Sequence, residues 1–128
     1  MSLETEVIAK YGPLFGNRIW WRVVPESVGR DQLSVPFCVV THAGGRSRVY
    51  ADNTMSDERN ARLEFTVWGD HVIAVMDKAR ELRQAVLDSD ADDWIVMLYG
   101  EAVSDYDDVL KLHGARQDFG IWHLVSPP

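Results

Sequence analysis

The chain has 128 residues, a length that suits one domain, and its 46% hydrophobic and 26% charged residues exclude disordered, collagen-like and low-complexity classes. A single cysteine, Cys38, excludes an intramolecular disulfide framework, and no apolar run approaches the roughly 18 residues that a membrane span requires. Glu4 and Glu6 stand where a signal peptide would carry positive charge, so we expect a soluble protein of a reducing compartment with no membrane partner.

The net charge of −7 arises in the second half of the chain. Residues 1–64 hold 8 basic and 8 acidic side chains, whereas residues 65–128 hold 5 basic and 12 acidic ones. Eight acidic residues occur from Asp88 to Asp108 without one Lys or Arg. Because such a segment repels a phosphate backbone, the sequence argues against specific nucleic-acid binding.

The first 60 residues predict a short helix, two strands and a long polar segment. Apolar residues recur at helical spacing from Leu3 to Tyr11, and Gly12 with Pro13 ends that helix. Residues 18–24 alternate as a strand, and residues 37–42 form a β-branched run typical of a largely buried strand. The polar residues 43–60 predict either a protruding loop or a long two-stranded arm.

The remaining residues predict one long helix and three strands. Residues 61–68 alternate cleanly, with Leu63, Phe65 and Val67 on the inward face. An amphipathic helix of about five turns follows, with Asp70 as its expected N-cap. We then expect a buried strand over residues 94–99, an acidic loop over residues 101–108 and a closing strand over residues 116–125.

Together these elements predict a single α+β domain spanning residues 1–128, in the order α-β-β-β-α-β-β. Its antiparallel or mixed sheet has about five strands, with both helices packed on one face. The other face carries Trp20, Trp68 and Trp122 with no helix left to cover it. Either a partner covers this face, or loop residues and curling of the sheet do.

Motifs for catalysis and metal binding are absent from the sequence. There is no GxSxG, GxxxxGK[ST], GxGxxG, CxxC or HExxH pattern, and the four histidines are scattered. The run from Asp88 to Asp92 opens like a calcium loop, but position six is Asp93 in place of Gly and position twelve is Tyr99 in place of Glu. Cys38 has the setting of a small buried hydrophobe. We therefore expect no catalytic residue, no metal and no cofactor.

The order of these elements resembles the tail completion proteins of long-tailed bacteriophages. The resemblance rests on the strand around Ile19-Trp20-Trp21, the strand Pro36-Phe37-Cys38-Val39-Val40, the strand from Arg62 to Gly69 leading into a long helix, and the closing strand from Arg116 to Trp122. These proteins are the tail terminators, similar in fold to the terminator of lambda-like phages.

The resemblance implies a structural virion protein without enzymatic activity. Its copies would form a ring, commonly hexameric, that caps the tail tube, fixes tail length and presents a surface to the head connector. The expected partners are other copies of the chain, the tube protein and the head-tail connector protein, and the expected location is the virion tail, with assembly in the host cytoplasm.

Two sets of residues are candidates for contacts in such a ring. For contact with a neighbouring copy or the tube we expect Arg46, Arg48, Tyr50, Arg59, Trp20 and Trp68, since Arg and aromatic residues are enriched at interfaces. Four acidic residues, Glu101, Asp105, Asp107 and Asp108, are candidates for the ring lumen, where negative charge would let DNA slide past; an acidic outer rim is equally consistent with the sequence. The alternatives are another head-tail joining or minor tail protein, and a small-molecule-binding domain with a pocket around Trp20 and Trp68.

Overall fold

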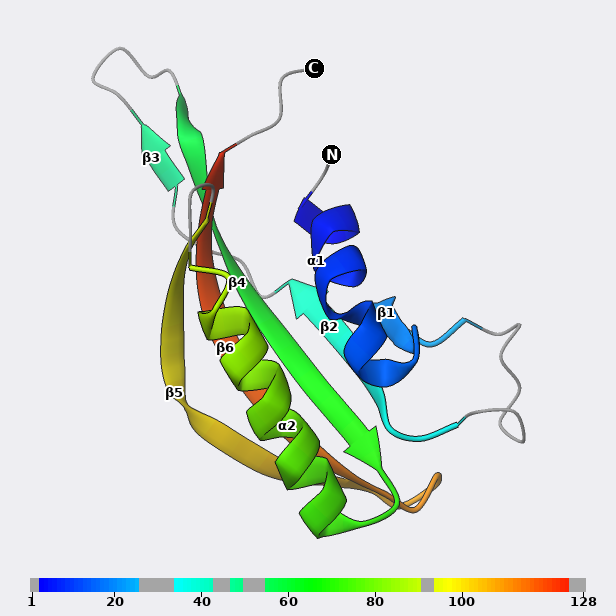
Figure 1. Ribbon diagram of the computed structural model, residues 1–128. Helices are drawn as coiled ribbons and strands as arrows, with labels where there is room; N and C mark the ends of the chain where they lie inside the picture. Colours follow the sequence, from blue (N-terminus) through cyan, green and yellow to red (C-terminus); the bar gives the residue numbers. More distant parts are fainter. Residues whose placement is uncertain (1–2, 26–33, 43–46, 50–54, 91–93, 125–128) are drawn as a thin grey trace.

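The computed structural model describes residues 3–25, 34–42, 47–49, 55–90 and 94–124, and shows two helices lying on one face of a twisted sheet (Figure 1). Helix α1 (Leu3–Tyr11) leads into a 3₁₀ turn, η1 (Gly12–Phe15), and helix α2 (Val72–Leu87) crosses the sheet. The strands are β1 (Ile19–Trp21), β2 (Phe37–His42), β3 (Ser47–Val49), β4 (Met55–Gly69), β5 (Trp94–Asp107) and β6 (Leu112–Leu124). The predicted α+β class, with both helices on one face, is confirmed.

The helices begin and end close to where the apolar periodicity predicts. On α2 the buried residues Val75, Ala79, Leu82 and Val86 follow helical spacing. The expected Asp70 cap is wrong: the N-cap residue is His71, whose backbone is extended and whose side chain makes no capping hydrogen bond. The first turn of α2 therefore lacks the side-chain acceptor that helix N-termini usually have.

The sheet is mixed, with strand order β1-β2-β4-β6-β5 and β3 added beside β4. β1 runs parallel to β2, and the other neighbouring pairs are antiparallel. β4 is longer than predicted because its first residues pair with β3 and with the end of β6. Of the two alternatives for residues 43–60, the pairing of β3 with β4 confirms the two-stranded arm, which lies beyond the end of α2 in Figure 1.

The core lies between the helices and the sheet. α1 and η1 contribute Leu3, Val7, Tyr11 and Phe15, which pack with the buried stripe of α2 and with the inward residues of the strands. Phe65 is central, since both the Tyr11 and the Phe119 rings meet it edge-on, with centroids 5.8 Å and 5.6 Å away. The Tyr11 hydroxyl reaches Ser89 Oγ at 2.8 Å, which joins the first helix to the end of α2.

Two predictions for β5 are wrong. The expected acidic loop is the second half of this 14-residue strand, because residues 103–107 pair with β6, and only Asp108 of the four acidic candidates lies in the turn that follows. The segment 94–99 was expected to be buried, but Ile95 is 61% exposed because β5 is the outermost strand of the sheet. Within the described residues, no helix is long and apolar enough to cross a membrane.

Candidate interaction surface

The sheet face that bears no helix carries an aromatic cluster near β1. Phe37 is only 2% exposed although it lies on this face, because the Trp20 ring packs beside it at 5.8 Å between centroids and Trp68 is its cross-strand neighbour. Trp68 in turn lies over Gly114, where an added Cβ would come within 2.8 Å of the indole ring. Trp20 and Trp68 thus bury Phe37 and remain half-buried themselves.

A polar cluster occupies the same face on the side of β5. Arg62 donates to Asp118 Oδ2 from both Nε (3.0 Å) and Nη2 (2.7 Å), and its guanidinium lies 5.0 Å from the centroid of the Tyr99 ring. Gly120 leaves room for Tyr99, since a Cβ there would lie 2.6 Å from the ring. The face is therefore a patterned surface in which glycines on β6 accept large side chains from both neighbouring strands.

The outer strand β5 exposes apolar side chains on both of its faces. Ile95, Met97 and Val103 lie on the face without helices, whereas Leu98 and Tyr106 lie on the helix side, and all five are exposed. In the described part of the chain β5 has a neighbour on one side only, β6. A long exposed apolar edge strand is a template for pairing with another chain, so this edge is the strongest candidate interface.

The acidic candidates are arranged along β5 and its turn, and they have different local roles. Glu101 accepts a hydrogen bond from Arg83 of α2 at 3.1 Å. Asp107 accepts from the backbone N–H groups of Val109 and Leu110, both at 2.9 Å, and so stabilises the turn into β6. Asp105 and Asp108 are exposed.

The basic and aromatic candidates of the arm are described only in part. Arg46 and Tyr50 lie outside the described residues. Arg48 lies in β3, and Arg59 lies in β4 opposite Ser47 of β3 and His123 of β6. The backbone thus places Arg48 and Arg59 on the same two-stranded arm, whereas Trp20 and Trp68 belong to the sheet face described above.

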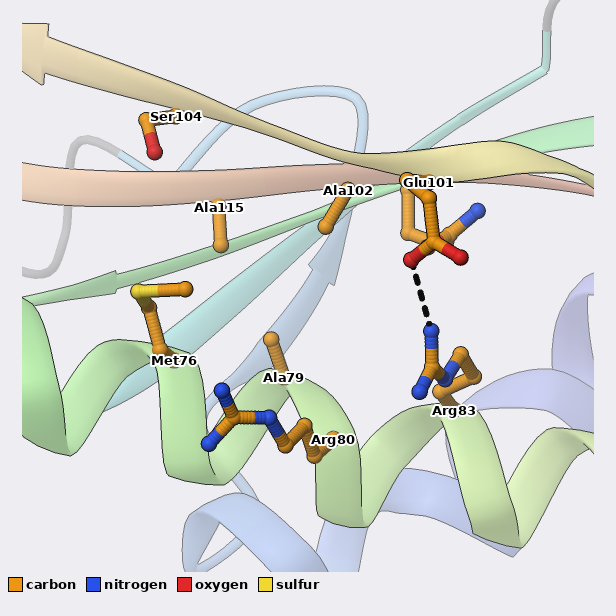
Figure 2. A pocket seen from close by; sticks show the side chains of 9 residues that line it. Met76, Ala79, Arg80, Arg83, Glu101, Ala102, Ser104 and Ala115 are labelled. Atoms are coloured by element: carbon orange, nitrogen blue, oxygen red, sulfur yellow. Dashed lines mark hydrogen bonds and ion pairs between the residues drawn. The ribbon is translucent and has the colours of Figure 1, made fainter.

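A cavity of about 140 Å³ lies between α2 and the strands β5 and β6 (Figure 2). Its lining residue Ala115 faces the helices, whereas Trp20 and Trp68 lie on the other face of the sheet. Met76, Ala79 and Arg80 line it from the helix, and Ala102, Ser104 and Ala115 from the strands, while the Arg83–Glu101 ion pair spans its edge. The pocket expected around the two tryptophans therefore does not coincide with this cavity.

The cavity lies at an irregularity in β5 that the sequence analysis missed. The register of β5 against β6 shifts between Tyr99 and Val103, and Gly100 adopts a positive φ of 72°. Gln117, 5% exposed, donates from Nε2 to the Gly100 carbonyl oxygen at 2.8 Å, while its Oε1 accepts no hydrogen bond from any described residue. Gln117 is a polar residue at an inward position of β6, where the alternating pattern calls for an apolar one. This departure from the pattern is the signal in the sequence that could have indicated such a contact.

The titratable groups inside the core are not poised for catalysis. Burial raises the pKa of the Cys38 thiol far above its ordinary value, which outweighs the opposing effect of a backbone hydrogen bond with Thr66. Burial likewise raises the pKa of Tyr11, against the smaller lowering effect of its bond to Ser89. A neutral buried thiol is a poor nucleophile. Among the residues that the structure describes, no three His, Cys, Asp or Glu side chains are grouped so that they could hold a metal ion.

A scan against protein-family models and a search of curated proteins find no match to this chain.

Proposed function

We propose that this protein is a structural subunit of a long-tailed bacteriophage that caps the end of the tail tube as a ring of six copies. The ring would stop the tube at its proper length and present a surface for the head connector. The observation that carries the proposal is the exposed apolar edge of β5, where Ile95 is 61% and Val103 50% exposed. An exposed apolar edge strand is a template for pairing with another chain, which is what a ring subunit requires.

Two further features support an assembly role. The arm formed by β3 and β4 extends the sheet beyond the helical layer, where it could reach a neighbouring copy or the tube. The four acidic candidates, now located along β5 and its turn, would lie toward the lumen or the rim according to how the copies are oriented. Both features fit a protein that acts by binding other copies or other proteins through its surface.

The direct test is electron microscopy of particles from the encoding phage or prophage with this gene deleted. We expect abnormally long tubes without heads, and restoration of normal tails by the wild-type gene supplied in trans. Tails of normal length without heads would instead assign the protein to the head-tail joining step. Intact particles would overturn the proposal.

One observation favours a second candidate, a small-molecule-binding domain: the cavity between α2 and β5. Its volume suits only a very small ligand, and its lining combines apolar groups with Arg80, Arg83 and Ser104. A thermal shift with a panel of metabolites tests it. A shift that is lost when Ala115→Leu fills the cavity would support this candidate, and the absence of any shift would remove it.

A further inference from the structure

The two outer strands of the sheet, β1 and β5, are complementary to each other. In the described part of the chain they are the two ends of the strand path β1-β2-β4-β6-β5. β1 is flanked by Arg22 and by Arg18, whose Nε also donates to the Pro36 carbonyl oxygen. The second half of β5 carries the exposed Asp105, together with Glu101, which pairs with Arg83, and Asp107, which accepts from the turn. One edge is therefore basic and the other acidic.

The strand directions are also compatible. β1 is parallel to β2, and each following step from β2 through β4 and β6 to β5 is antiparallel. β5 therefore runs opposite to β1. If β5 of one copy lay beside β1 of a second copy in the same orientation, the two strands would form an antiparallel pair, the pattern of the other three steps.

The side-chain rows across the sheet give a register for that pair. One row contains Trp20, Val39, Thr66, Arg116 and Val103, and the adjacent row contains Phe37, Trp68, Gly114 and Asp105. Arg18 precedes β1 by one residue and joins the second row, because its carbonyl oxygen accepts from Cys38 N, next to Phe37. Rows that continue into a second copy would bring Val103 beside Trp20 and Asp105 beside Arg18.

We propose that copies of this chain associate head to tail by pairing the β5 edge of one copy with the β1 edge of the next, so that the sheet continues across the interface. The proposal rests on the ring in the proposed function and names the surface that would build it. Such an interface is heterologous, so it gives a closed ring where the rotation between copies closes and a filament where it does not. Opposite charges fix the register, and the apolar pair Trp20 and Val103 adds buried area.

Charge reversal tests the pairing in purified full-length protein, with association measured by light scattering and analytical ultracentrifugation over a wide concentration range. Asp105→Arg and Arg18→Asp should each weaken self-association by roughly tenfold or more, because like charges then meet in the interface. The double variant should recover most of the wild-type association, since every interface again contains one pair of opposite charges. Glu4→Arg is the matched control for Asp105→Arg: it makes the same change in net charge in the first turn of α1, on neither edge strand, and should leave association unchanged.

Cysteine trapping tests the same contact without depending on its affinity. Native Cys38 is fully buried and does not compete. Under mild oxidation at high protein concentration, Arg18→Cys combined with Asp105→Cys should give a ladder of disulfide-linked oligomers, whereas each single variant should remain uncrosslinked. Circular dichroism and thermal unfolding establish that each variant is folded. If a variant at position 18 does not fold, Asp105→Arg and Val103→Lys still test whether the β5 edge takes part in self-association.

Three results would overturn the inference. Dimers from the single Asp105→Cys variant would show symmetric pairing of β5 with β5. A folded double-cysteine variant that stays monomeric under oxidation would show that the two edges do not meet, and a charge-reversed double variant that associates no better than the single variants would show the same. Normal tails in the gene-deletion phage would remove the proposed function and leave the edge-to-edge contact standing, so the two can fail separately.

Discussion

At the scale of single residues, the buried carboxamide of Gln117 holds the irregular part of β5 in place. Its Nε2 group satisfies the Gly100 carbonyl oxygen where the register of β5 against β6 shifts. The bond is partly buried, and removing Gln117 leaves the Gly100 carbonyl oxygen without this donor. We expect Gln117→Leu to reduce the free energy of unfolding by about 1–3 kcal/mol, measured by urea denaturation.

Asp118 is the matched control for Gln117 on the same strand. It pairs with Arg62, whose side chain is half exposed. Asp118→Asn should therefore reduce the free energy of unfolding by less than about 1 kcal/mol. Equal losses from the two variants would mean that the Gln117 contact contributes no more than a surface pair.

Gly114 is required by the ring of Trp68. A Cβ at this position would lie 2.8 Å from Trp68 Cζ3 and 3.1 Å from Cη2, closer than packed carbon atoms allow. We expect Gly114→Ala to destabilise the protein by roughly 1–3 kcal/mol. Trp68→Leu should relieve the clash, so that the cost of Gly114→Ala in that background falls toward zero in a double-mutant cycle; an undiminished cost would locate the strain elsewhere.

The buried groups Cys38 and Tyr11 make the protein less stable in alkali. Both pKa values are raised by burial, so folding favours the protonated forms; this stability is fully present below the ordinary pKa values of 9.0 and 10.0 and is lost as the pH rises above them. The Cys38 thiol lowers the free energy of unfolding by about 1.4 kcal/mol per pH unit between its unfolded and its folded pKa. Cys38→Ala should make the fall between pH 9 and 10 shallower; an unchanged slope would contradict the assignment.

At the scale of elements, the N-terminus of α2 lacks a side-chain cap. His71 occupies the N-cap position with an extended backbone and no capping hydrogen bond. His71→Asp would supply an acceptor for the first turn and a favourable charge for the helix dipole. We therefore expect it to raise the free energy of unfolding by about 1 kcal/mol, measured by thermal unfolding. Asp70→Ala serves as the control and should change little, because Asp70 is not the cap.

The elements that could be predicted from sequence are those whose own residues show a periodic or β-branched hydrophobic pattern. The periodic burial of α2 and the β-branched run of β2 gave elements that the structure confirms. The second half of β5 could not be predicted, since its exposed and acidic residues lack alternating hydrophobicity and its strand conformation depends on pairing with β6. The contact of Gln117 with Gly100 and the order of the strands in the sheet likewise depend on tertiary register.

At the scale of the whole molecule, the arm lies outside the part of the sheet that β2 covers. β3 pairs with β4 between Met55 and Arg59, whereas β2 pairs with β4 from Leu63 to Trp68. Deleting residues 46–59 would leave β2 and β4 joined by a short connection, and we expect cooperative unfolding with a loss below about 2 kcal/mol.

The same deletion separates stability from assembly. If the arm contacts the tube or a neighbouring copy, the folded deletion variant should fail to restore normal tails in the gene-deletion phage. Complementation at wild-type level, with tail lengths counted by electron microscopy, would exclude a role for the arm.

The contacts of α1 also bear on how the chain folds during synthesis. Tyr11 bonds to Ser89, and the Lys10 ammonium lies 4.9 Å from the centroid of the Trp94 ring, so the first helix packs against residues that a ribosome adds about 80 steps later. At roughly 5–20 residues per second, α1 waits on the order of 4–16 s for these partners. A helix of nine residues is only marginally stable by itself during that interval. The N-terminal segment therefore cannot complete these contacts until residues 89–94 have been made, and a nascent chain stalled before residue 89 exposes part of the apolar side of α1 to chaperones.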